Sequence, residues 1–379
     1  MPTHDIIVLG CGAMGAAATL ECAKRNLRVL AVDRAGVPNT ASSHHGVTRL
    51  FRMSTFEHPA YVPLLREARA DWDRLSADAA CDLFERTGML LAGPPAAAAV
   101  NDSIKACIDN VIDHEILDAT EIHRRFPIFD APPDYRALWE PGAGCLACER
   151  AIETMAAGAR ARGATILEHT PVRSWSATND AVTIRTDDAD HHAAALIITA
   201  GPWMPDLLAR DLAIELTVTR QVQFWLDPPP DRPATPPEHP TWAFDEPSGF
   251  TFAFPLVHAD TGCKTCRHLE PAPTTPDSID RTITDADLAP IRAFLQRNAP
   301  ALDTPVQRSS VCMYTQSPDS VFIVDRHPTH PNVAFACAFT GHGFKFAPVV
   351  GRALADLAID ARSELPIQPF SCARFARAT

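Results

Sequence analysis

The first thirty-three residues constrain the fold more than any other part of the chain. Residues 5–9 form a short apolar run typical of a buried parallel strand, residues 14–26 have the pattern of a helix, and residues 28–33 supply a second strand. The sequence GCGAMG at residues 10–15 lies between the first strand and the helix. Because strand, glycine turn, helix and a closing Asp33 follow in this order, we predict a βαβ unit that binds a dinucleotide.

Each glycine of this motif has a physical task. Gly10 permits a tight turn, Gly12 lets the backbone approach a pyrophosphate, and Gly15 allows close packing of the helix. Unpaired N–H groups at the start of the helix would face the phosphate charge. The carboxylate of Asp33 would accept hydrogen bonds from the adenosine ribose. A glycine-rich turn that binds no nucleotide is the alternative.

Length and charge limit the classes of protein and partner. A chain of 379 residues is long enough for two domains and a large buried cofactor. Its net charge of −12 argues against nucleic acid or an anionic membrane surface as a partner, so an anionic substrate would need local basic residues. We expect a cytoplasmic protein, because no apolar run approaches the roughly 20 residues that cross a bilayer and no charged and apolar leader is recognisable.

The cysteines favour buried thiols. The chain has eleven, an odd number at scattered positions, which is not typical of a disulfide framework. Two Cys-x-x-Cys pairs occur, Cys145 with Cys148 and Cys263 with Cys266, but more than a hundred residues separate them. That distance is far beyond the usual spacing of a zinc ribbon, so we predict no metal site.

Two domains are predicted to interleave along the chain. A dinucleotide-binding domain would comprise residues 1–82, 150–214 and 312–379, and a substrate domain residues 83–149 and 215–311. Local patterns predict a loop over 35–55, a helix over 61–75, strands at 83–93 and 137–140, a helix over 150–162, and strands at 165–169 and 194–201.

Residues 216–226 predict a half-buried antiparallel strand of the substrate domain. Their side chains alternate between an apolar face with Val218, Val222 and Phe224 and a polar face with Thr217, Thr219 and Gln221. The proline-rich stretch 227–240 lacks the backbone donors for a strand, so we predict a loop, and we favour a surface insertion over a lid. Residues 271–276 are interpreted in the same way.

Three further motifs carry a family resemblance: SHHGVTR at residues 43–49, SVCMYT at 310–315 and TGHGFKF at 340–346. Together with the glycine motif they resemble the monomeric sarcosine oxidase and N-methyltryptophan oxidase family, from about residue 5 to about residue 360. The resemblance implies FAD-dependent amine oxidation by a monomer of the D-amino acid oxidase type. It implies an α/β plus α+β fold, in which a Rossmann-like FAD-binding domain joins a substrate domain built on a mainly antiparallel sheet with helices.

The resemblance also implies a covalent flavin. A cysteine at the position of Cys312 bonds through sulfur to the 8α-methyl of FAD in that family, and His45 and Arg49 match basic residues beside the flavin ring. Nearby cations would lower the pKa of such a thiol and stabilise the anionic reduced flavin. The alternatives are a buried free cysteine at 312 and a solvated turn at His44 and His45.

Arg52 and Lys345 match a family pair that holds the substrate carboxylate. The arginine offers a fork and the lysine a point charge, and they come from distant parts of the chain, as a pocket between domains requires. A basic surface position is the alternative for Lys345. Lys264 matches, across an alignment gap, a lysine that faces the flavin and promotes reaction with dioxygen, and His268 matches a histidine of the substrate pocket. For Lys264 the alternative is an exposed side chain.

Departures from the family bear on the substrate. Phe252 replaces a tyrosine, and residues 53–57 replace a His-Ala-Tyr-Gly-Glu loop of which only Glu57 survives. The loss of two phenol hydroxyls makes the pocket less polar, so a hydrophobic or cyclic secondary amino acid fits better than sarcosine.

We therefore predict an FAD-dependent oxidase that converts a secondary-amine amino acid and dioxygen to an imine and hydrogen peroxide. The alternatives are a flavin dehydrogenase with another acceptor, a tailoring oxidase of a larger intermediate, and a nicotinamide-dependent or non-catalytic nucleotide-binding protein. The predicted catalytic residues are Lys264, Arg49, His45, Tyr314 and His268, and the substrate contacts are Arg52, Lys345, Phe252 and Glu57. The predicted cofactor contacts are Gly10, Gly12, Met14, Gly15, Asp33, Arg34, Ser42, His44, His45, Thr48, Val172, Gly201, Cys312, Gly341, Gly343, Phe344 and Lys345.

Overall fold

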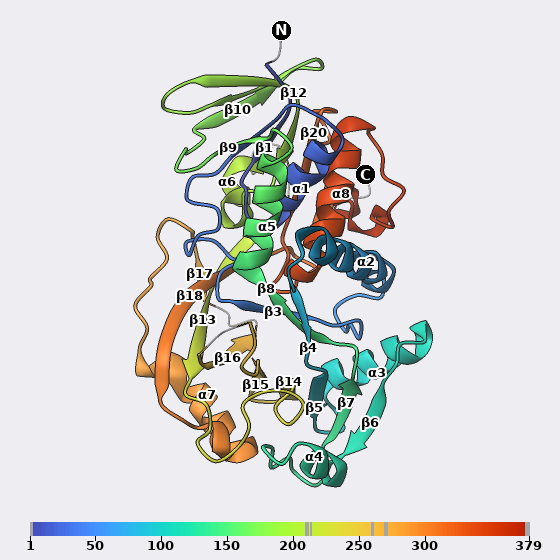
Figure 1. The fold of residues 1–379 in the computed structure, drawn as a ribbon, viewed down its shortest axis with the longest axis vertical. Coiled ribbons are helices and arrows are strands. Elements are labelled where there is room, and N and C mark those ends of the chain that lie inside the picture. Colours follow the sequence, from blue (N-terminus) through green and yellow to red (C-terminus); the bar gives the residue numbers. More distant parts are fainter. Residues whose placement is uncertain (1–2, 209–211, 213, 259–260, 269–271, 376–379) are drawn as a thin grey trace.

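The computed structural model describes residues 3–208, 212, 214–258, 261–268 and 272–375. The molecule is elongated and has two main parts, stacked along its long axis (Figure 1). The upper part contains a sheet with helices packed on it and the first strand of the chain, and the lower part contains a larger sheet (Figure 1). No helix of the described residues has both the length and the apolar character that crossing a membrane requires.

An eight-stranded sheet organises the upper part, and its central strands are parallel. The order is β10-β11-β12-β1-β2-β9, with β20 paired to β12 and β19 to β20. The strands are β1 (His4–Leu9), β2 (Val29–Val32), β9 (Thr165–Leu167), β10 (Ser174–Ala177), β11 (Val182–Arg185), β12 (Asp190–Ile198), β19 (Ile323–Arg326) and β20 (Val333–Cys337). The predicted βαβ unit is confirmed, because β1 pairs in parallel with β2 across helix α1 (Ala13–Lys24).

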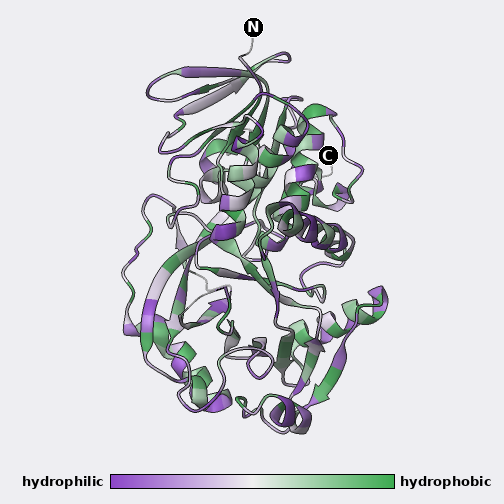
Figure 2. Ribbon diagram, viewed as in Figure 1, coloured by the Kyte–Doolittle hydropathy of each residue, from purple (hydrophilic) through white to green (hydrophobic). Residues whose placement is uncertain are grey.

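Small residues let the helices of this part pack closely. A Cβ atom at Gly15 of α1 would lie 1.8 Å from the carbonyl oxygen of Gly10, and one at Gly351 would lie 2.6 Å from Ala17. The close contact predicted for Gly15 is therefore observed. The helices of this part are α1, α2 (Tyr61–Ala79), α5 (Cys148–Arg160), α6 (Met204–Leu208) and α8 (Ala347–Ile359). Figure 2 shows hydrophilic residues along α2, which lies at the outside of this layer.

A nine-stranded, mostly antiparallel sheet forms the lower part. Its order is β17-β13-β16-β15-β14-β5-β7-β6, and β18 pairs with β13. The strands are β5 (Met89–Gly93), β6 (Glu115–Asp118), β7 (Arg136–Glu140), β13 (Thr217–Leu226), β14 (Thr241–Glu246), β15 (Gly249–Ala253), β16 (Cys263–His268), β17 (Pro273–Thr274) and β18 (Val306–Gln316). The helices of this part are α3 (Ala98–Asn110), α4 (Ala119–Arg125) and α7 (Asp285–Asn298). The predicted fold class, a Rossmann-like sheet joined to a mainly antiparallel one, is confirmed.

One face of this large sheet forms a hydrophobic core, and the other face lines a cavity. One face packs Phe224, Trp242 and Phe244 against Phe294 of α7 and forms a hydrophobic core. The prediction that β13 is half-buried is wrong, because its polar face is covered as well: Gln221 is only 3% exposed. This covered polar face looks into the site described below.

Two loop predictions need correction. The predicted loop 35–55 contains β3 (Thr48–Phe51), which forms a small third sheet with β8 (Gly144–Ala147) and β4 (Phe84–Arg86). The predicted loop 271–276 contains β17, whose two residues pair with Val218 and Thr219 of β13. A pairing this short is compatible with the surrounding prolines. Residue 271 itself lies outside the described residues. The stretch 227–240 has no strand or helix, as predicted. The predicted domain boundary at residues 311 and 312 falls within β18, a strand of the nine-stranded sheet.

Candidate functional site

A cavity of about 440 Å³ opens at the carboxyl ends of the parallel strands, and we call it the sheet-end cavity. The glycine turn after β1, the end of β2 and the turn after β12 all contribute to it. Carboxyl ends of parallel strands are where such sheets bind ligands. Twelve of the predicted cofactor contacts line this cavity: Gly10, Gly12, Met14, Asp33, Arg34, Ser42, His44, Val172, Gly201, Gly341, Gly343 and Phe344.

The local geometry of the cavity fits a dinucleotide. Gly10 has a φ of +89°, and a Cβ there would lie 2.7 Å from the carbonyl oxygen of Thr199, so only glycine suits this turn. Gly12 precedes α1 without a side-chain cap, which leaves backbone N–H groups of the first turn for an anion. Asp33 accepts from the backbone N–H groups of Cys11 at 2.7 Å and Ala35 at 2.9 Å. Each of its oxygens keeps a second lone pair for a ribose hydroxyl.

A clasp of three side chains, Arg34, Trp203 and Asp277, lines one part of the sheet-end cavity. The guanidinium of Arg34 lies 4.4 Å from the centre of the Trp203 ring and forms an ion pair of 3.2 Å with Asp277. The indole N–H of Trp203 donates to the same carboxylate at 3.0 Å. Sequence reasoning identified only Arg34, because Asp277 follows a proline-rich stretch that was interpreted as a surface loop.

The loop before β3 is buried and holds one permanent cation. His44 and His45 are 6% and 3% exposed, so the alternative of a solvated turn is wrong. Burial lowers the pKa of His44 to about 3 and that of His45 to about 4, so both rings are neutral at pH 7. The guanidinium of Arg49 donates to the carbonyl oxygens of Thr48, Ser43 and His45, which fixes it in place. Arg49, rather than His45, therefore supplies positive charge here.

A second cavity, of about 100 Å³, lies against the polar face of the large sheet, and we call it the aromatic cavity. The strand register explains why residues distant in sequence meet there. In β13, Gln221 is opposite Cys312 of β18, and Gln223 is opposite Cys266 of β16. In β15, Phe252 is opposite Cys266. Directly opposite residues point to the same face of a sheet, so one face presents all of these side chains.

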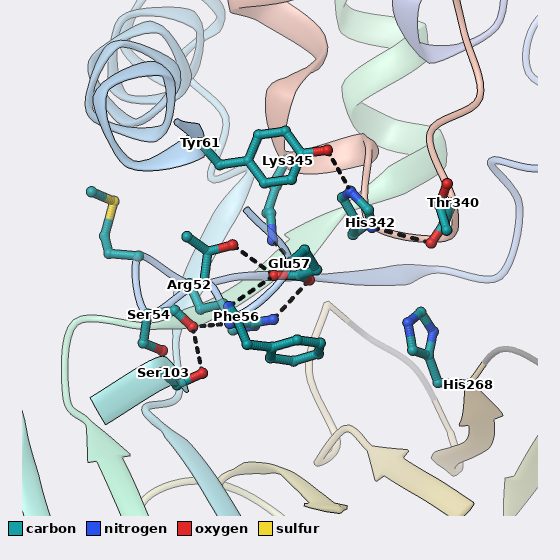
Figure 3. Close-up of polar contacts among 12 residues, drawn as sticks. Arg52, Ser54, Phe56, Glu57, Tyr61, Ser103, His268, Thr340, His342 and Lys345 are labelled. Carbon is teal, nitrogen blue, oxygen red and sulfur yellow. Dashed lines mark hydrogen bonds and ion pairs between the residues drawn. The ribbon is translucent and has the colours of Figure 1, made fainter. Parts of the chain in front are cut away.

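A buried ionic cluster forms one end of the aromatic cavity (Figure 3). Arg52 donates to the carboxylate of Glu57 at 2.8 Å and to the carbonyl oxygen of Ser54, and the ammonium of Lys345 lies 4.0 Å from Glu57. Burial alone would raise the pKa of Glu57, but Arg52 and Lys345 hold it well below its usual range. Burial lowers the pKa of Lys345 to about 8. Arg52 and Lys345 share the one carboxylate of Glu57, whereas the buried Glu140, which also acts on Lys345, accepts from the backbone N–H groups of Met53 and Ser54. The two cations therefore have N–H donors that a second carboxylate could accept from. Lys345 is 3% exposed, which rules out a basic surface position.

A second buried ammonium, that of Lys264, also lines the aromatic cavity. It donates to the carbonyl oxygens of Gly46 at 2.9 Å and Thr48 at 2.5 Å, and it lies 4.6 Å from the centre of the Phe254 ring. The alternative of an exposed Lys264 is wrong, because the residue is 2% exposed. Burial and the charge of Arg49 lower the pKa of Lys264 to about 8.

Glu149 fixes the loop that holds Lys264. Its carboxylate, in the first turn of α5, accepts from the backbone N–H of Gly46 at 2.6 Å and of Val47 at 2.9 Å. These bonds orient the peptide whose carbonyl oxygen meets Lys264. Sequence reasoning missed Glu149, since a glutamate at a helix start is common and gave no signal of a distant partner.

Aromatic side chains form the wall of the aromatic cavity. The predicted Phe252 is one of them, and its ring meets that of Phe254 edge to face at 5.9 Å. His268 contacts the rings of Phe250 and Tyr314 at 5.6 and 5.5 Å, and its Nδ1 lies 3.3 Å from the Tyr314 hydroxyl. Burial lowers the pKa of His268 to about 4, so it adds no third charge. Sequence reasoning missed three members of the wall: Phe56, Phe250 and Phe254.

The two cavities adjoin each other. Arg49, Tyr314, Gly341 and Phe344 line both of them. Gly341 has a φ of +77°, and a Cβ there would lie 2.4 Å from the Tyr314 ring, so any side chain would close this junction. A ligand held in the sheet-end cavity can therefore present one end to a second ligand in the aromatic cavity.

Five predicted cofactor contacts lie outside the lining of the sheet-end cavity: Gly15, His45, Thr48, Cys312 and Lys345. Gly15 instead packs α1 against the turn, and Cys312 and Lys345 line the aromatic cavity. His45 Nε2 pairs with the Ser310 hydroxyl at 3.0 Å, behind the cavity lining. Nine of the eleven cysteines are buried, and Cys81 and Cys372 are partly exposed. In the part of the chain that the structure describes, no three His, Cys, Asp or Glu side chains gather as metal ligands would.

Comparison with known proteins adds the family. A family model described as FAD dependent oxidoreductase matches residues 5–357. A monomeric sarcosine oxidase from Streptomyces avermitilis is 35% identical over 381 aligned residues, which cover 100% of this chain and 99% of the relative. An N-methyl-L-tryptophan oxidase from Salmonella arizonae is 31% identical over 99% of this chain and 100% of the relative.

Solved structures share the fold. NikD, an unusual amino acid oxidase essential for nikkomycin biosynthesis, superposes with a TM-score of 0.88 at 22% identity, covering 98% of each chain. L-Proline dehydrogenase from P. horikoshii superposes with a TM-score of 0.84 at 22% identity, covering 99% of this chain and 98% of that one. At this identity the likeness concerns the arrangement of the two sheets and the helices.

Proposed function

The chain belongs to the family of FAD-dependent oxidoreductases, and from that premise we propose that it oxidises an amino acid whose amine is secondary. The family resemblance that the motifs indicated is thereby confirmed. The relatives named for sarcosine and for N-methyl-L-tryptophan support a substrate with an N-methyl group, and the largely phenylalanine wall favours an apolar or cyclic one. The observation that carries the proposal is a buried ionic cluster that faces an aromatic wall beside the cofactor cavity.

The sheet-end cavity would hold FAD. The start of α1 and Gly12 would receive the pyrophosphate, and Asp33 the ribose hydroxyls, as their geometry supports. When bound, FAD accepts a hydride from the substrate carbon and passes two electrons on to the oxidant. Cys312 would bond covalently to the 8α-methyl carbon of the flavin, since it lines the neighbouring cavity and its sulfur lies 3.5 Å from the carbonyl oxygen of Ser43, in the loop that binds Arg49. The thiol and the methyl group would each lose one hydrogen in this step, and the two electrons would pass to dioxygen, which leaves as hydrogen peroxide.

The charged cluster would orient the substrate. Arg52 and Lys345 bind its carboxylate, and Glu57 keeps both cations in place. The neutral ring of His268 lets the amine enter as the free base without meeting a third cation. Phe252 and its aromatic neighbours exclude water, which strengthens each of these electrostatic contacts.

The overall reaction balances with dioxygen as the second substrate. The amino acid loses a hydride from carbon and a proton from nitrogen and becomes an imine, and dioxygen takes the two electrons and two protons and leaves as hydrogen peroxide. The imine then hydrolyses to an amine and a carbonyl compound, or stays closed if it is cyclic. Lys264 would promote the oxygen step, because a fixed positive charge stabilises the negative charge that develops on oxygen.

The protein would act as a monomer in the cytoplasm. An odd number of cysteines at scattered, mostly buried positions is typical of proteins in a reducing compartment. The name of the sarcosine oxidase relatives supports a monomer.

A peroxide-coupled screen of the purified protein with N-methyl and cyclic amino acids tests the function. We expect a yellow protein that releases peroxide with at least one of them and little with the matching primary amino acid. A colourless protein would contradict the cofactor. Bleaching of the flavin without peroxide release in air would indicate a dehydrogenase instead.

A further inference from the structure

Gln223 of β13 lines the aromatic cavity and has no assigned task. It is 5% exposed, and neither its amide oxygen nor its amide nitrogen has a hydrogen-bond partner among the described residues. Gln221, two residues earlier on the same face, differs, because its amide nitrogen donates to the Thr219 hydroxyl at 3.0 Å. A buried primary amide without partners is costly, so a cavity that contains one is expected to receive a polar ligand there.

The amide of Gln223 is close to the loop that holds Lys264. A Cβ atom built on Gly46 would lie 2.2 Å from the Gln223 amide oxygen, and Lys264 donates to the carbonyl oxygen of that same Gly46 at 2.9 Å. Strand register gives the same result: Gln223 is opposite Cys266, and Trp225 is opposite Lys264, so glutamine and lysine are diagonal neighbours on one face.

Gln223 and Lys264 form a group apart from the ionic cluster that would bind the substrate. Lys264 donates to the carbonyl oxygens of Gly46 and Thr48, whereas Arg52 and Lys345 both contact the carboxylate of Glu57, so the two groups share no partner in these contacts. A ligand between Gln223 and Lys264 would therefore be distinct from the substrate carboxylate.

The donor and acceptor inventory defines the ligand. Lysine carries three N–H donors, and the carbonyl oxygens of Gly46 and Thr48 use two of them. A carboxamide offers two donors and one acceptor oxygen, all without partners here. Thr48 Oγ1 is also buried without a partner in the described chain. Such a set suits one small oxygen ligand. Water can both donate to the amide oxygen and accept from the N–H groups, and dioxygen, as it takes negative charge, can accept from the Gln223 amide N–H and from the remaining N–H of Lys264.

On the basis of the proposed function, we propose that the Gln223 carboxamide and the Lys264 ammonium together bind a small oxygen ligand: water in the resting protein, and dioxygen in its place when the reduced flavin is reoxidised. Gln223 is then a second contact of the oxygen site. Its neutral amide orients the ligand through a hydrogen bond, whereas Lys264 supplies the positive charge.

Crystal structures of the oxidised holoenzyme and of its Gln223→Met variant test the site directly. We expect density for one oxygen atom within hydrogen-bond distance of both the Gln223 amide and Lys264 Nζ, and its loss in the variant. A flavin or substrate atom bonded to the amide would overturn the proposal, as would wild-type density with no ligand between the two groups. The wild-type density decides this even if the variant does not fold.

Stopped-flow kinetics give the second readout. Gln223→Met should slow reoxidation by about tenfold, the value of one hydrogen bond of about 1.4 kcal/mol, and leave anaerobic reduction by substrate within about twofold. Thr251→Val is the control. Like Gln223→Met, it removes a buried polar group that has no hydrogen-bond partner among the described residues, but this group lies on the core-facing side of β15. Unchanged reoxidation, or equal slowing of both half-reactions, would contradict the proposal.

The oxygen site is testable even if the substrate class is wrong. Dithionite reduces the flavin without any amino acid, and mixing with dioxygen then measures reoxidation alone. A protein that turns over no secondary amine but still shows the Gln223 effect would refute the proposed function and keep the oxygen site.

Discussion

The two cavities of this protein are built by different means. The sheet-end cavity is formed largely by backbone: glycines of a tight turn, the start of α1 and the carboxyl ends of parallel strands. The aromatic cavity is formed largely by side chains of the antiparallel strands β13, β15, β16 and β18, together with the loop between β3 and α2 and residues 341–345. Backbone recognition needs few residue types and suits a shared cofactor, whereas a cavity made of side chains is where specificity can change. Single substitutions should therefore have small effects on cofactor binding in the sheet-end cavity and large effects on substrate binding and reactivity in the aromatic cavity.

The largest expected effect concerns the link between the cavities. Cys312 lines the aromatic cavity, yet we propose that it bonds to the ligand of the other one. The wild-type protein should retain its yellow colour after acid precipitation, and Cys312→Ala should release all of it. Cys337→Ala is the control, because it removes a buried thiol on the opposite side of the sheet-end cavity. A Cys312→Ala protein that keeps its flavin through denaturation would show that no thioether forms at this position.

A smaller but still large effect is expected for Lys264. Lys264→Met should slow reoxidation by about 100 to 1,000-fold, since removal of one fixed electrostatic group often has that effect, and should change anaerobic reduction much less. Lys105→Met, on an exposed lysine with 72% side-chain accessibility, is the matched control. Stopped-flow rates that are the same for wild type and Lys264→Met would separate Lys264 from the oxygen reaction.

The next effect concerns substrate binding in the aromatic cavity, through Arg52. Arg52→Ala should raise KM or the dissociation constant of a carboxylate ligand by about tenfold or more, since 1.4 kcal/mol corresponds to a factor of ten. The flavin spectrum should barely change. The substitution also removes one of the two cations that contact Glu57 and leaves Lys345 as the other. The double variant Arg52→Ala/Glu57→Gln therefore separates loss of the guanidinium from the effect of an unbalanced carboxylate.

An uncharged substrate analogue sharpens that test. An amide or ester in place of the carboxylate should be a poor substrate of the wild-type protein and no poorer for Arg52→Ala. Equal impairment with charged and uncharged substrates would mean that Arg52 supports the loop 52–57 rather than the substrate.

Raising the pH should affect a different quantity in each half-reaction, although both effects are centred near pH 8. Burial lowers the pKa of both Lys345 and Lys264 to about 8, below the ordinary value for lysine, so each charge is present below pH 8 and lost as the pH rises through it. Above pH 8 the KM should rise, by severalfold between pH 7 and 9, through Lys345. The reoxidation rate should fall over the same range through Lys264 alone. A Lys264→Met variant with an unchanged pH profile of reoxidation would contradict this assignment.

How much of the site could be predicted follows from how each cavity is built. Gly10, Gly12 and Asp33 were identified because their spacing is fixed by one local βαβ unit. Gln223 was not, because an alternating strand gives no sign of what covers its polar face, and here that face looks into a cavity instead of solvent. Lys264, Cys312 and Lys345 came from family resemblance, since they lie on segments far apart in the chain. Strand register brings Lys264 and Cys312 to one face of the large sheet, and Lys345 lies in a turn just before α8.

The smallest expected effect tests how little side chains contribute to the sheet-end cavity. Asp277 pairs with Arg34 and Trp203 at its edge, with side chains 63% and 44% exposed for Asp277 and Arg34. Exposed ion pairs contribute about 0 to 1 kcal/mol, so Asp277→Ala should raise the dissociation constant of FAD by at most about fivefold. The measurement needs the Cys312→Ala background, in which the flavin is free to exchange. Asp190→Ala, which removes the exposed pair with Arg185 away from both cavities, is the control. Because salt screens exposed charges, the difference between the two variants should shrink at 1 M salt. A loss of a hundredfold or more would mean that the clasp, and not the backbone, provides most of the affinity in this cavity.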